Sequence, residues 1–398
     1  MHIVRLIPDE NSKYHFGEGG LTESSIIFHS NSLFSAIVNN FIKLYGEDEF
    51  NKYKEKMKEL KTSSLFPAIY QFNLDNSEIE TPSKEILFIP KPMLKLGFDE
   101  ETTKEVEEKP KDVKKIKFIS IGALKDHNKR ELKKITIEKE FLISKEEIEF
   151  LISKKEKENF DYKKLENIKL FKKIIEQKVS IDRIKGTTLE DDDKGQLYSI
   201  EFIKPLRKKN KKENATKLNV VGFYFLIDFQ NIDEDLKKKI KASINLIKDE
   251  GLGGKRSIGA GTFKNIIINE FKEDLTIDKT LLNEKHKTQN KEYIAEEKRI
   301  TLSITIPKDE NEFKCFDNYQ LIKIGGYIYP SQNSMKNITK LKKSVYAIAE
   351  GSICNEEIEG DNRDLRPNGV IHEVILNGRM ISIPVIFYDE CNEEEGEL

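Results

Sequence analysis

The chain has 398 residues, of which 37% are hydrophobic and 35% are charged. This length is enough for two domains, each with its own core. The charges nearly cancel to a net −2, so any basic surface for nucleic acid must be local. The cysteines Cys315, Cys354 and Cys391 have no CxxC spacing, which argues against a zinc site and favours a reducing compartment. No apolar run approaches the ~20 residues that span a bilayer, so we expect a cytoplasmic protein without membrane contact.

The first part of the chain alternates strands with a helix. Apolar residues recur at i, i+3 and i+4 spacing over residues 33–45, which predicts an amphipathic helix. Ser30, Asn31 or Ser32 is expected to cap that helix. Short apolar and β-branched runs predict strands at 2–7, 65–72 and 86–89.

Residues 98–178 are dense in Lys and Glu and contain only short apolar segments. We interpret them as a charged, partly mobile insertion and not as a separate catalytic domain. Within them, 116–121 predicts an ordered apolar segment and 145–155 a helix. The basic runs are typical either of a solvated surface or of a binding surface.

Two alternating segments joined by an acidic tip predict a long hairpin over residues 179–202. Arg183, Thr187 and Thr188 lie in its first half. Hydroxyl-bearing β-branched residues beside an Arg suit contact with a nucleic-acid strand, although an ordinary hairpin explains them equally well. The run 204–217, nearly all Lys, Arg and Asn, predicts a flexible basic loop.

A glycine-rich loop is the most distinctive feature of the sequence. It runs from Gly251 to Gly261 and also contains Gly253, Gly254 and Gly259. Lys255, Arg256 and Ser257 lie among these glycines. Glycine adopts φ > 0 freely, so the loop is expected to expose successive N–H groups that, with two cations, suit a phosphate-bearing ligand. A helix C-cap with a bulged turn is the alternative, but it accounts for only one or two of the glycines.

The loop follows a predicted helix at 233–248 and precedes a predicted strand at 262–271. Rossmann and P-loop motifs run in the opposite order, from strand through loop to helix. Arg256 also stands where a P-loop requires Ser or Thr. We therefore expect no nucleotide cofactor.

The rest of the chain is β-rich. A strand is predicted at 220–229, before the helix, and residues 272–294 are expected to form a polar linker. Further strands are predicted at 299–306, 319–329, 344–349, 374–376 and 380–387. An acidic tail at 393–397 is typical of a solubilising end.

This order of elements fits a ferredoxin-like (RRM-like) α+β domain over residues 1–271, with a degenerate second copy over 295–398. The aromatic motif with which RRM strands stack on RNA bases is not visible. Base stacking on a sheet face is therefore not predicted.

Two histidines are candidates for chemistry. His15 or His29 has the right side chain for a general base in RNA cleavage. Alternatively, His29, Ser30 and Ser32 bind phosphate at a helix N-terminus, or only cap the helix. No HxH or HExxH pattern supports a metal site, and the acidic residues 190–193 are more typical of a solvated hairpin tip than of a weak cation site.

Together these stretches resemble the RAMP superfamily of CRISPR-associated proteins, whose signature is the glycine loop after a helix. Four segments further resemble the family of the fourth subunit of type III-A (Csm) effector complexes. They are 28–36 (FHSNSLFSA), 181–188 with 195–198 (IDRIKGTT, GQLY), the loop 251–261, and 343–352 (KSVYAIAEGS). Asn31 is a departure, since the family often has Asp there.

The resemblance implies a subunit without catalysis, cofactor or metal. Such a subunit holds the 5′ repeat-derived tag of the crRNA and bridges the large polymerase-like Csm subunit to the first backbone RAMP Csm subunit. The hairpin resembles the thumb that interrupts the guide–target duplex, which implies target RNA near it. The implied RNA-binding residues are His29, Ser30, Ser32, Arg183, Thr187, Thr188, Lys255, Arg256, Ser257 and the glycines 251, 253, 254, 259 and 261.

Two related functions compete with this interpretation. A repeat-cleaving CRISPR endoribonuclease shares the fold and a similar loop, but cleaves with a histidine-centred site. The chain length, the long hairpin and the Ala-Glu-Gly-Ser segment at 349–352 argue against it. A backbone RAMP that cleaves target RNA through an Asp is disfavoured by Asn31.

Overall fold

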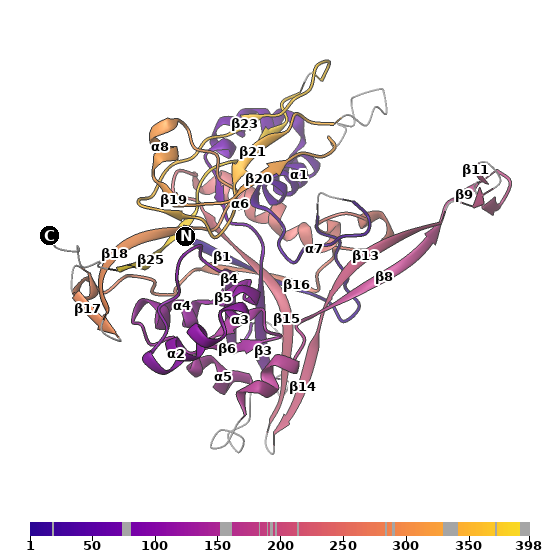
Figure 1. The fold of residues 1–398 in the computed structure, drawn as a ribbon. Helices are drawn as coiled ribbons and strands as arrows, with labels where there is room; N and C mark the ends of the chain where they lie inside the picture. Colours follow the sequence, from indigo (N-terminus) through magenta and orange to yellow (C-terminus); the bar gives the residue numbers. More distant parts are fainter. Residues whose placement is uncertain are drawn as a thin grey trace.

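A computed structural model describes most of the chain (Figure 1). The described residues are 1–17, 20–73, 81–151, 161–182, 184–188, 190–191, 194–195, 197–212, 215–282, 285–288, 291–328, 341–370 and 372–390. The molecule is a mixed α+β structure built on one large sheet and several smaller ones. Within these ranges, no helix has the length and apolar character needed to cross a membrane.

Four strands and two helices form the N-terminal unit. In chain order they are β1 (His2–Ile7), α1 (Ser30–Lys58), β3 (Phe66–Asn73), β15 (Ala215–Asp228), α6 (Glu234–Asn245) and β16 (Asn265–Glu270). The sheet order is β16-β1-β15-β3, and all neighbours are antiparallel. This is the β-α-β-β-α-β arrangement of a ferredoxin-like unit. The helices pack together on one face, where Asn40 of α1 donates a hydrogen bond to the Ser243 carbonyl of α6 at 3.1 Å.

Helix α1 is longer than the predicted 33–45 and begins earlier. Gly46 interrupts it with φ 85° and ψ 168°, so two helical segments meet at a kink. The N-cap residue is His29, whose side chain makes no capping bond. The prediction that Ser30, Asn31 or Ser32 caps the helix is therefore wrong, because all three lie inside the first turn.

Part of the charged segment 98–178, which we interpret as an insertion, extends the main sheet. Its strands β5 (Phe118–Ser120), β7 (Phe141–Ile143) and β6 (Ile135–Ile137) continue the sheet beyond β4 (Lys84–Pro90). Helices α2 (Glu100–Glu108), α3 (Pro110–Lys115), α4 (Ile121–Asn128) and α5 (Lys145–Leu151) surround these strands. The short apolar segments are buried strands, and the charges lie on the exposed faces of the helices and loops.

Two antiparallel hairpins extend from the sheet (Figure 1). The longer one pairs β8 (Phe171–Val179) with β13 (Leu197–Pro205), so it begins earlier and ends later than the predicted 179–202. Toward its tip lie the short pairs β9 (Ile181–Asp182) with β10 (Thr187–Thr188) and β11 (Glu190–Asp191) with β12 (Lys194–Gly195). The second hairpin pairs β14 (Arg207–Lys212) with β15, so the predicted flexible loop at 204–217 is largely strand.

The C-terminal part is β-rich, as predicted, and is centred on the long pair β18 (Lys291–Thr301) and β25 (Ser382–Glu390). The remaining elements are β2 (Lys61–Thr62), η2 (Tyr162–Asn167), α7 (Ile247–Glu250), η3 (Arg256–Ile258), η4 (Lys279–Leu281), β17 (Lys285–Thr288), α8 (Glu310–Lys314), β19 (Phe316–Asn318), β20 (Leu321–Ile324), β21 (Val345–Ile348), β22 (Ile353–Cys354), β23 (Arg363–Asp364) and β24 (Ile375–Leu376). Ile300, Ile383 and Val385 pack in the same buried cluster as Ile3 and Leu226 of the N-terminal unit. The two halves therefore share a hydrophobic core.

His127 at the end of α4 connects the segment 98–178 to the C-terminal half. Its side chain is fully buried. The Gly97 amide donates to Nδ1 at 2.7 Å, so Nε2 carries the proton and donates to the Ile386 carbonyl at 3.0 Å. Burial lowers the pKa of His127 from 6.5 to about 4, which keeps the ring neutral in the folded protein.

This histidine predicts an acid-sensitive fold. Between pH 6.5 and about 4 the unfolded state binds a proton at His127 that the folded state does not. As the pH is lowered from 6.5 to about 4, this group should therefore reduce the free energy of unfolding by up to about 1.4 kcal/mol per pH unit. The full stability contribution of His127 is present only above pH 6.5. The variant His127→Asn keeps an acceptor for the Gly97 amide but does not titrate. Its free energy of unfolding, measured with urea, should fall less steeply as the pH is lowered than that of the original protein. The exposed His372→Asn serves as the control, and equal pH slopes for all three proteins would contradict the assignment.

Candidate nucleic-acid interface

The glycine loop lies between α7 and β16, which confirms the predicted order of helix, loop and strand. Five of its residues have left-handed backbone conformations: Gly251 (φ 75°), Gly253 (86°), Lys255 (62°), Gly259 (80°) and Gly261 (90°). Four of the five are glycines, the residue that adopts positive φ at no steric cost. Lys255 adopts the same region with a side chain, at the start of the short turn η3.

Close backbone packing explains most of these glycines. A Cβ atom on Gly261 would overlap the carbonyl oxygen of Leu252 across the loop. One on Gly253 would lie 2.5 Å from the carbonyl oxygen of His15. At Gly259, by contrast, a Cβ atom would meet nothing within 4 Å. Packing therefore requires glycine at 253 and 261, whereas at 259 only the positive φ favours it.

The loop amides correct part of the sequence interpretation. The amides of Leu252, Gly254 and Gly261 donate to the carbonyls of Gly261, His15 and Lys13, and that of Gly259 donates to Arg256. The amides of Gly254 and Gly261 hold the loop against residues 13–16, and those of Leu252 and Gly259 close the loop on itself, so these four N–H groups do not form an open row of donors. Purely conformational reasons, the alternative to phosphate binding, thus account for more of the glycines than the one or two expected. The part of the loop that faces solvent is its tip, residues 255–259, where Ser257, Ile258 and Gly259 are exposed.

The tip of the loop lies beside the long hairpin, near the outer end of the pair of strands β8 and β13. Lys255 Nζ is 5.8 Å from the ring centroid of Tyr198 on β13. Behind the tip, Ala260 packs in one buried cluster with Ile200 and Phe202 of the same strand. Lys13 forms an ion pair with Glu176 of β8. The loop, residues 13–16 and the strands β8 and β13 of the hairpin therefore form one continuous surface.

Sequence reasoning missed Tyr198 and Lys13 as parts of this surface. The alternation along 197–202 could have placed Tyr198 on the same strand face as Ile200 and Phe202. No signal in the sequence indicated that this face meets the glycine loop, because the contact joins segments about sixty residues apart.

The hairpin tip is not part of this surface. Thr187 and Thr188 are exposed on β10, where they pair with Asp182 and Ile181. Their partners Ile181 and Asp182 lie three and four residues beyond Lys178, which pairs with Tyr198, so they are about 10–13 Å further along the hairpin. Arg183 lies outside the described residues. The predicted RNA-binding residues thus fall into at least two separate places.

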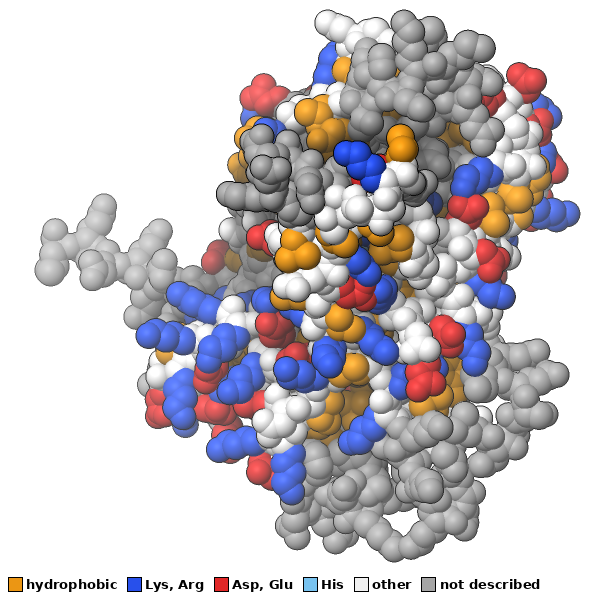
Figure 2. Space-filling model, turned by 90° about the vertical axis from the view of Figure 1, so that its right-hand side faces the viewer, with side chains coloured by type: hydrophobic (Ala, Val, Ile, Leu, Met, Phe, Trp, Pro, Cys, Tyr) orange, Lys and Arg blue, Asp and Glu red, His pale blue; other side chains and the backbone are white. Residues whose placement is uncertain are grey.

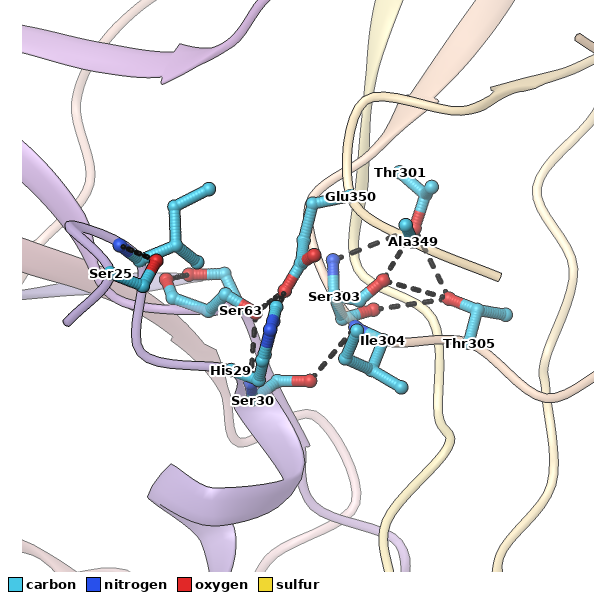
Figure 3. A network of polar contacts seen from close by, with 12 residues as sticks. Ser25, His29, Ser30, Ser63, Thr301, Ser303, Ile304, Thr305, Ala349 and Glu350 are labelled. Carbon is cyan, nitrogen blue, oxygen red and sulfur yellow. Dashed lines mark hydrogen bonds and ion pairs between the residues drawn. The ribbon is translucent and has the colours of Figure 1, made fainter. Parts of the chain in front are cut away.

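The start of α1 is a contact between the two halves of the protein (Figure 3). His29 Nδ1 lies 2.8 Å from a carboxylate oxygen of buried Glu350, and the Ser64 hydroxyl donates to the same oxygen. Burial alone would raise the pKa of Glu350, but the charge and hydrogen bond of His29 and the Ser64 bond hold it below its ordinary value. The negative group near this helix N-terminus is therefore supplied by the protein itself.

Ser30 and its neighbours differ in their access to a ligand. Ser30 is only 2% exposed, and its hydroxyl accepts a hydrogen bond from the Ile304 amide at 2.9 Å (Figure 3). His29 keeps 27% of its side chain exposed, and Ser32 is half-buried. His15, the other candidate base, is 7% exposed, with Nδ1 2.8 Å from the Glu201 carbonyl oxygen. Across the described part of the chain, no three His, Cys, Asp or Glu side chains are placed to hold a metal ion.

The packing of the loop predicts unequal costs for two similar substitutions. Gly259→Ala should cost about 1–2 kcal/mol of stability, because only left-handed strain is added. Gly261→Ala should cost at least about 1–3 kcal/mol more, because the new methyl group overlaps the Leu252 carbonyl and the loop must move. Thermal and urea unfolding of the two variants measure the difference. Equal losses would show that the loop does not pack as described.

Two family models match the chain: the RAMP superfamily over residues 11–264 and the CRISPR Csm4 C-terminal domain over residues 295–385. A "CRISPR system Cms protein Csm4" of Methanocaldococcus jannaschii is 42% identical over 408 aligned positions, which cover 96% of this chain and 97% of that protein. The protein of the same name from Streptococcus thermophilus is 24% identical and covers 91% and 92% of the two chains.

A solved structure is similar over the same length. A chain in the crystal structure of a Csm3–Csm4 subcomplex of the type III-A CRISPR-Cas interference complex is 36% identical, with a TM-score of 0.60. The match covers 96% of this chain and 99% of that one. The helices before the glycine loop and the loop itself lie inside the region that matches the RAMP model, which ends at residue 264, directly before β16. On these grounds the chain belongs to the RAMP superfamily and, within it, to the Csm4 family of type III CRISPR complexes.

Proposed function

We propose that this chain is a non-catalytic subunit of a type III-A CRISPR interference complex that holds the 5′ repeat-derived tag of the crRNA. The observation that carries the proposal is the fixed position of Lys255, Arg256 and Ser257 at the tip of a tightly packed loop, beside strand β13 of the hairpin. Binding of a polyanionic RNA strand depends mainly on cations held at defined positions. The two cations at the tip of this loop meet that need.

Each part of the loop has its own role in this proposal. Lys255 and Arg256 contact tag phosphates, and the exposed Ser257 hydroxyl bonds a ribose or base. Gly259, with open space around it, lets the RNA backbone approach closely. Gly251, Gly253, Gly254 and Gly261 act indirectly, because their close packing shapes the loop and leaves the cations at its tip.

The hairpin carries a second RNA contact. Arg183, Thr187 and Thr188 are proposed to meet the guide–target duplex, and hence the target RNA, near the hairpin tip. The projection of this hairpin from the body supports the proposal (Figure 1). Of the residues at the start of α1, His29 and Ser32 are proposed to lie against the tag, since both are partly exposed. Ser30 would act only by holding that segment in place.

The partners follow from the family. The similar Csm3–Csm4 structure supports binding to a backbone RAMP Csm subunit, and the large polymerase-like Csm subunit is the proposed second neighbour.

We keep the division into a ferredoxin-like domain over 1–271 and a degenerate copy over 295–398 as part of the proposal. The free thiols of Cys315 and Cys354 suit a cytoplasmic complex.

A histidine-centred endoribonuclease is the second candidate function. The pair of His29 and Glu350 favours it, since a carboxylate that orients an imidazole is a common feature of general bases. Against it, the His15 ring is buried beneath the glycine loop, with its Cδ2 atom 2.8 Å from where a Cβ on Gly254 would lie. His29 also has a structural role between the halves. The non-catalytic proposal therefore fits the geometry better.

Replacing both tip cations tests the proposed tag site. Lys255→Ala combined with Arg256→Ala should weaken binding of tagged crRNA and reduce the slope of log K against log salt by up to about 1.4, near 0.7 for each lost phosphate contact. Fluorescence anisotropy at several salt concentrations measures both quantities. Lys52→Ala combined with Lys238→Ala removes the same charge from exposed positions on α1 and α6 and should change little. Unchanged affinity and slope in the loop variant would remove the loop from the RNA site.

A further inference from the structure

The main sheet ends at β16, whose outer side is open. β16 pairs with β1 on one side, and no other strand of the described residues pairs with it (Figure 1). None of its six residues is buried, whereas four of the six residues of β1 are. The strand therefore presents a free edge of the sheet.

The pairing with β1 shows which backbone groups point out from this edge. The Phe271 amide donates to the Met1 carbonyl at 3.2 Å. In an antiparallel ladder, residues that bond to the neighbouring strand alternate with residues that do not. Every second residue before Phe271 therefore bonds to β1, and the amides and carbonyls of Ile266, Ile268 and Glu270 point outward.

The edge of β16 has little protection against further pairing. Edge strands are commonly guarded by Lys, Pro or a bulge. Between Asn265 and Glu270 there is no Lys or Pro, and the register with β1 does not shift. The Asn265 side chain accepts a hydrogen bond from the Ile266 amide at 2.9 Å, which leaves the groups further along the edge free of this local cover. Three consecutive isoleucines also favour an extended chain that can take up another strand.

Cations flank the edge at both ends. Lys264 directly precedes β16 and Lys272 follows it. Lys248 lies near the start of the strand, because the amide of the residue before Lys264 donates to its carbonyl at 3.0 Å. All three lysines are exposed, and none of them forms an ion pair within the described part of the chain. Residues 262–272 contain one acidic residue, Glu270.

This excess of positive charge differs from the rest of the surface in view. Figure 2 shows Lys and Arg side chains interspersed with Asp and Glu over the face that it presents. A partner that carries acidic side chains therefore complements the flanks of β16.

We propose that β16 adds a strand from a neighbouring protein subunit, an extended segment with acidic side chains that meet Lys264 and Lys272. Main-chain hydrogen bonds to Ile268 and Glu270 hold this strand in register. RNA fits the edge less well, because its phosphates accept hydrogen bonds and leave the outward carbonyls unpaired. A second copy of this chain is disfavoured, because two such edges bring like charges together. The inference rests on the proposed place of the chain in a complex, but not on the glycine loop or the hairpin.

Hydrogen exchange tests the edge directly. It is measured on the isolated chain and on the chain assembled with the backbone and large Csm subunits. In the isolated chain the outward amides of Ile268 and Glu270 should exchange fast, while the inward amides of Ile267 and Asn269 are protected by β1. Assembly should slow the exchange of the two outward amides at least about tenfold. Equal rates before and after assembly would overturn the proposal.

Two variants of the full-length chain test the charge and the backbone separately. Lys264→Glu with Lys272→Glu should weaken binding of the Csm subunits at least about tenfold, as measured without RNA. Lys111→Glu with Lys114→Glu makes the same change at exposed positions of α3, which leads into β5, and should bind within about twofold of the original protein. Ile268→Pro removes an outward amide, spares the inward hydrogen bonds to β1 and should also weaken binding, in a protein whose folding is checked by thermal unfolding.

The remaining outcomes separate this surface from the tag site and from self-association. Lys255→Ala with Arg256→Ala should leave the binding of the Csm subunits unchanged, so the edge and the glycine loop can fail independently. Subunit binding that survives both the charge reversal and a folded Ile268→Pro variant would overturn the proposal. Sedimentation that shows a dimer of the isolated chain, lost in Ile268→Pro, would assign the edge to a second copy and overturn it as well.

Discussion

The glycine loop keeps its shape because its backbone lies in direct contact with residues 13–16. Gly253 and Gly261 leave no room for a side chain, and the amides of Gly254 and Gly261 bond to carbonyls of that segment. This contact fixes the tip of the loop and places Lys255 beside Tyr198 on the hairpin. If the loop amides bound a ligand instead, the loop would lose its hydrogen bonds to residues 13–16. Here the amides supply rigidity, and the side chains at the tip are left for the proposed contact with RNA.

The two halves of the protein are joined by buried contacts. They share a buried cluster, and Glu350 from the C-terminal half is bound by His29 and Ser64 at the start of α1. An unpaired carboxylate in such a place would cost several kcal/mol, roughly 3–5, so both partners matter to the fold. The Glu of the Ala-Glu-Gly-Ser segment at 349–352, part of the resemblance to the family, thus has a structural role in this chain: it joins the two halves.

The sequence was informative where the signal was local. The strand at 2–7, the helix before the glycine loop, the strand after it and the existence of a long hairpin could all be predicted from periodicity and turn residues. Pairing between distant segments could not. The segment 116–121 was predicted to be ordered, but the short stretches 135–137 and 141–143 were not recognised among so many charges, and their neighbours in the sheet make all three into strands. The same holds for the basic run, which is strand because β15 pairs with it, and for Ser30, which is buried by residues 274 positions away.

The central claim is that this chain holds RNA and leaves cleavage to other proteins. The most direct measurement follows the fate of the RNA: the purified chain is incubated with tagged crRNA and with repeat RNA, and bound and free RNA are resolved for length. The account predicts that the RNA is bound and remains intact, and that His15→Ala and His29→Ala leave its length unchanged. Specific cleavage by the isolated chain, abolished by either histidine substitution in a protein that still folds, would contradict it.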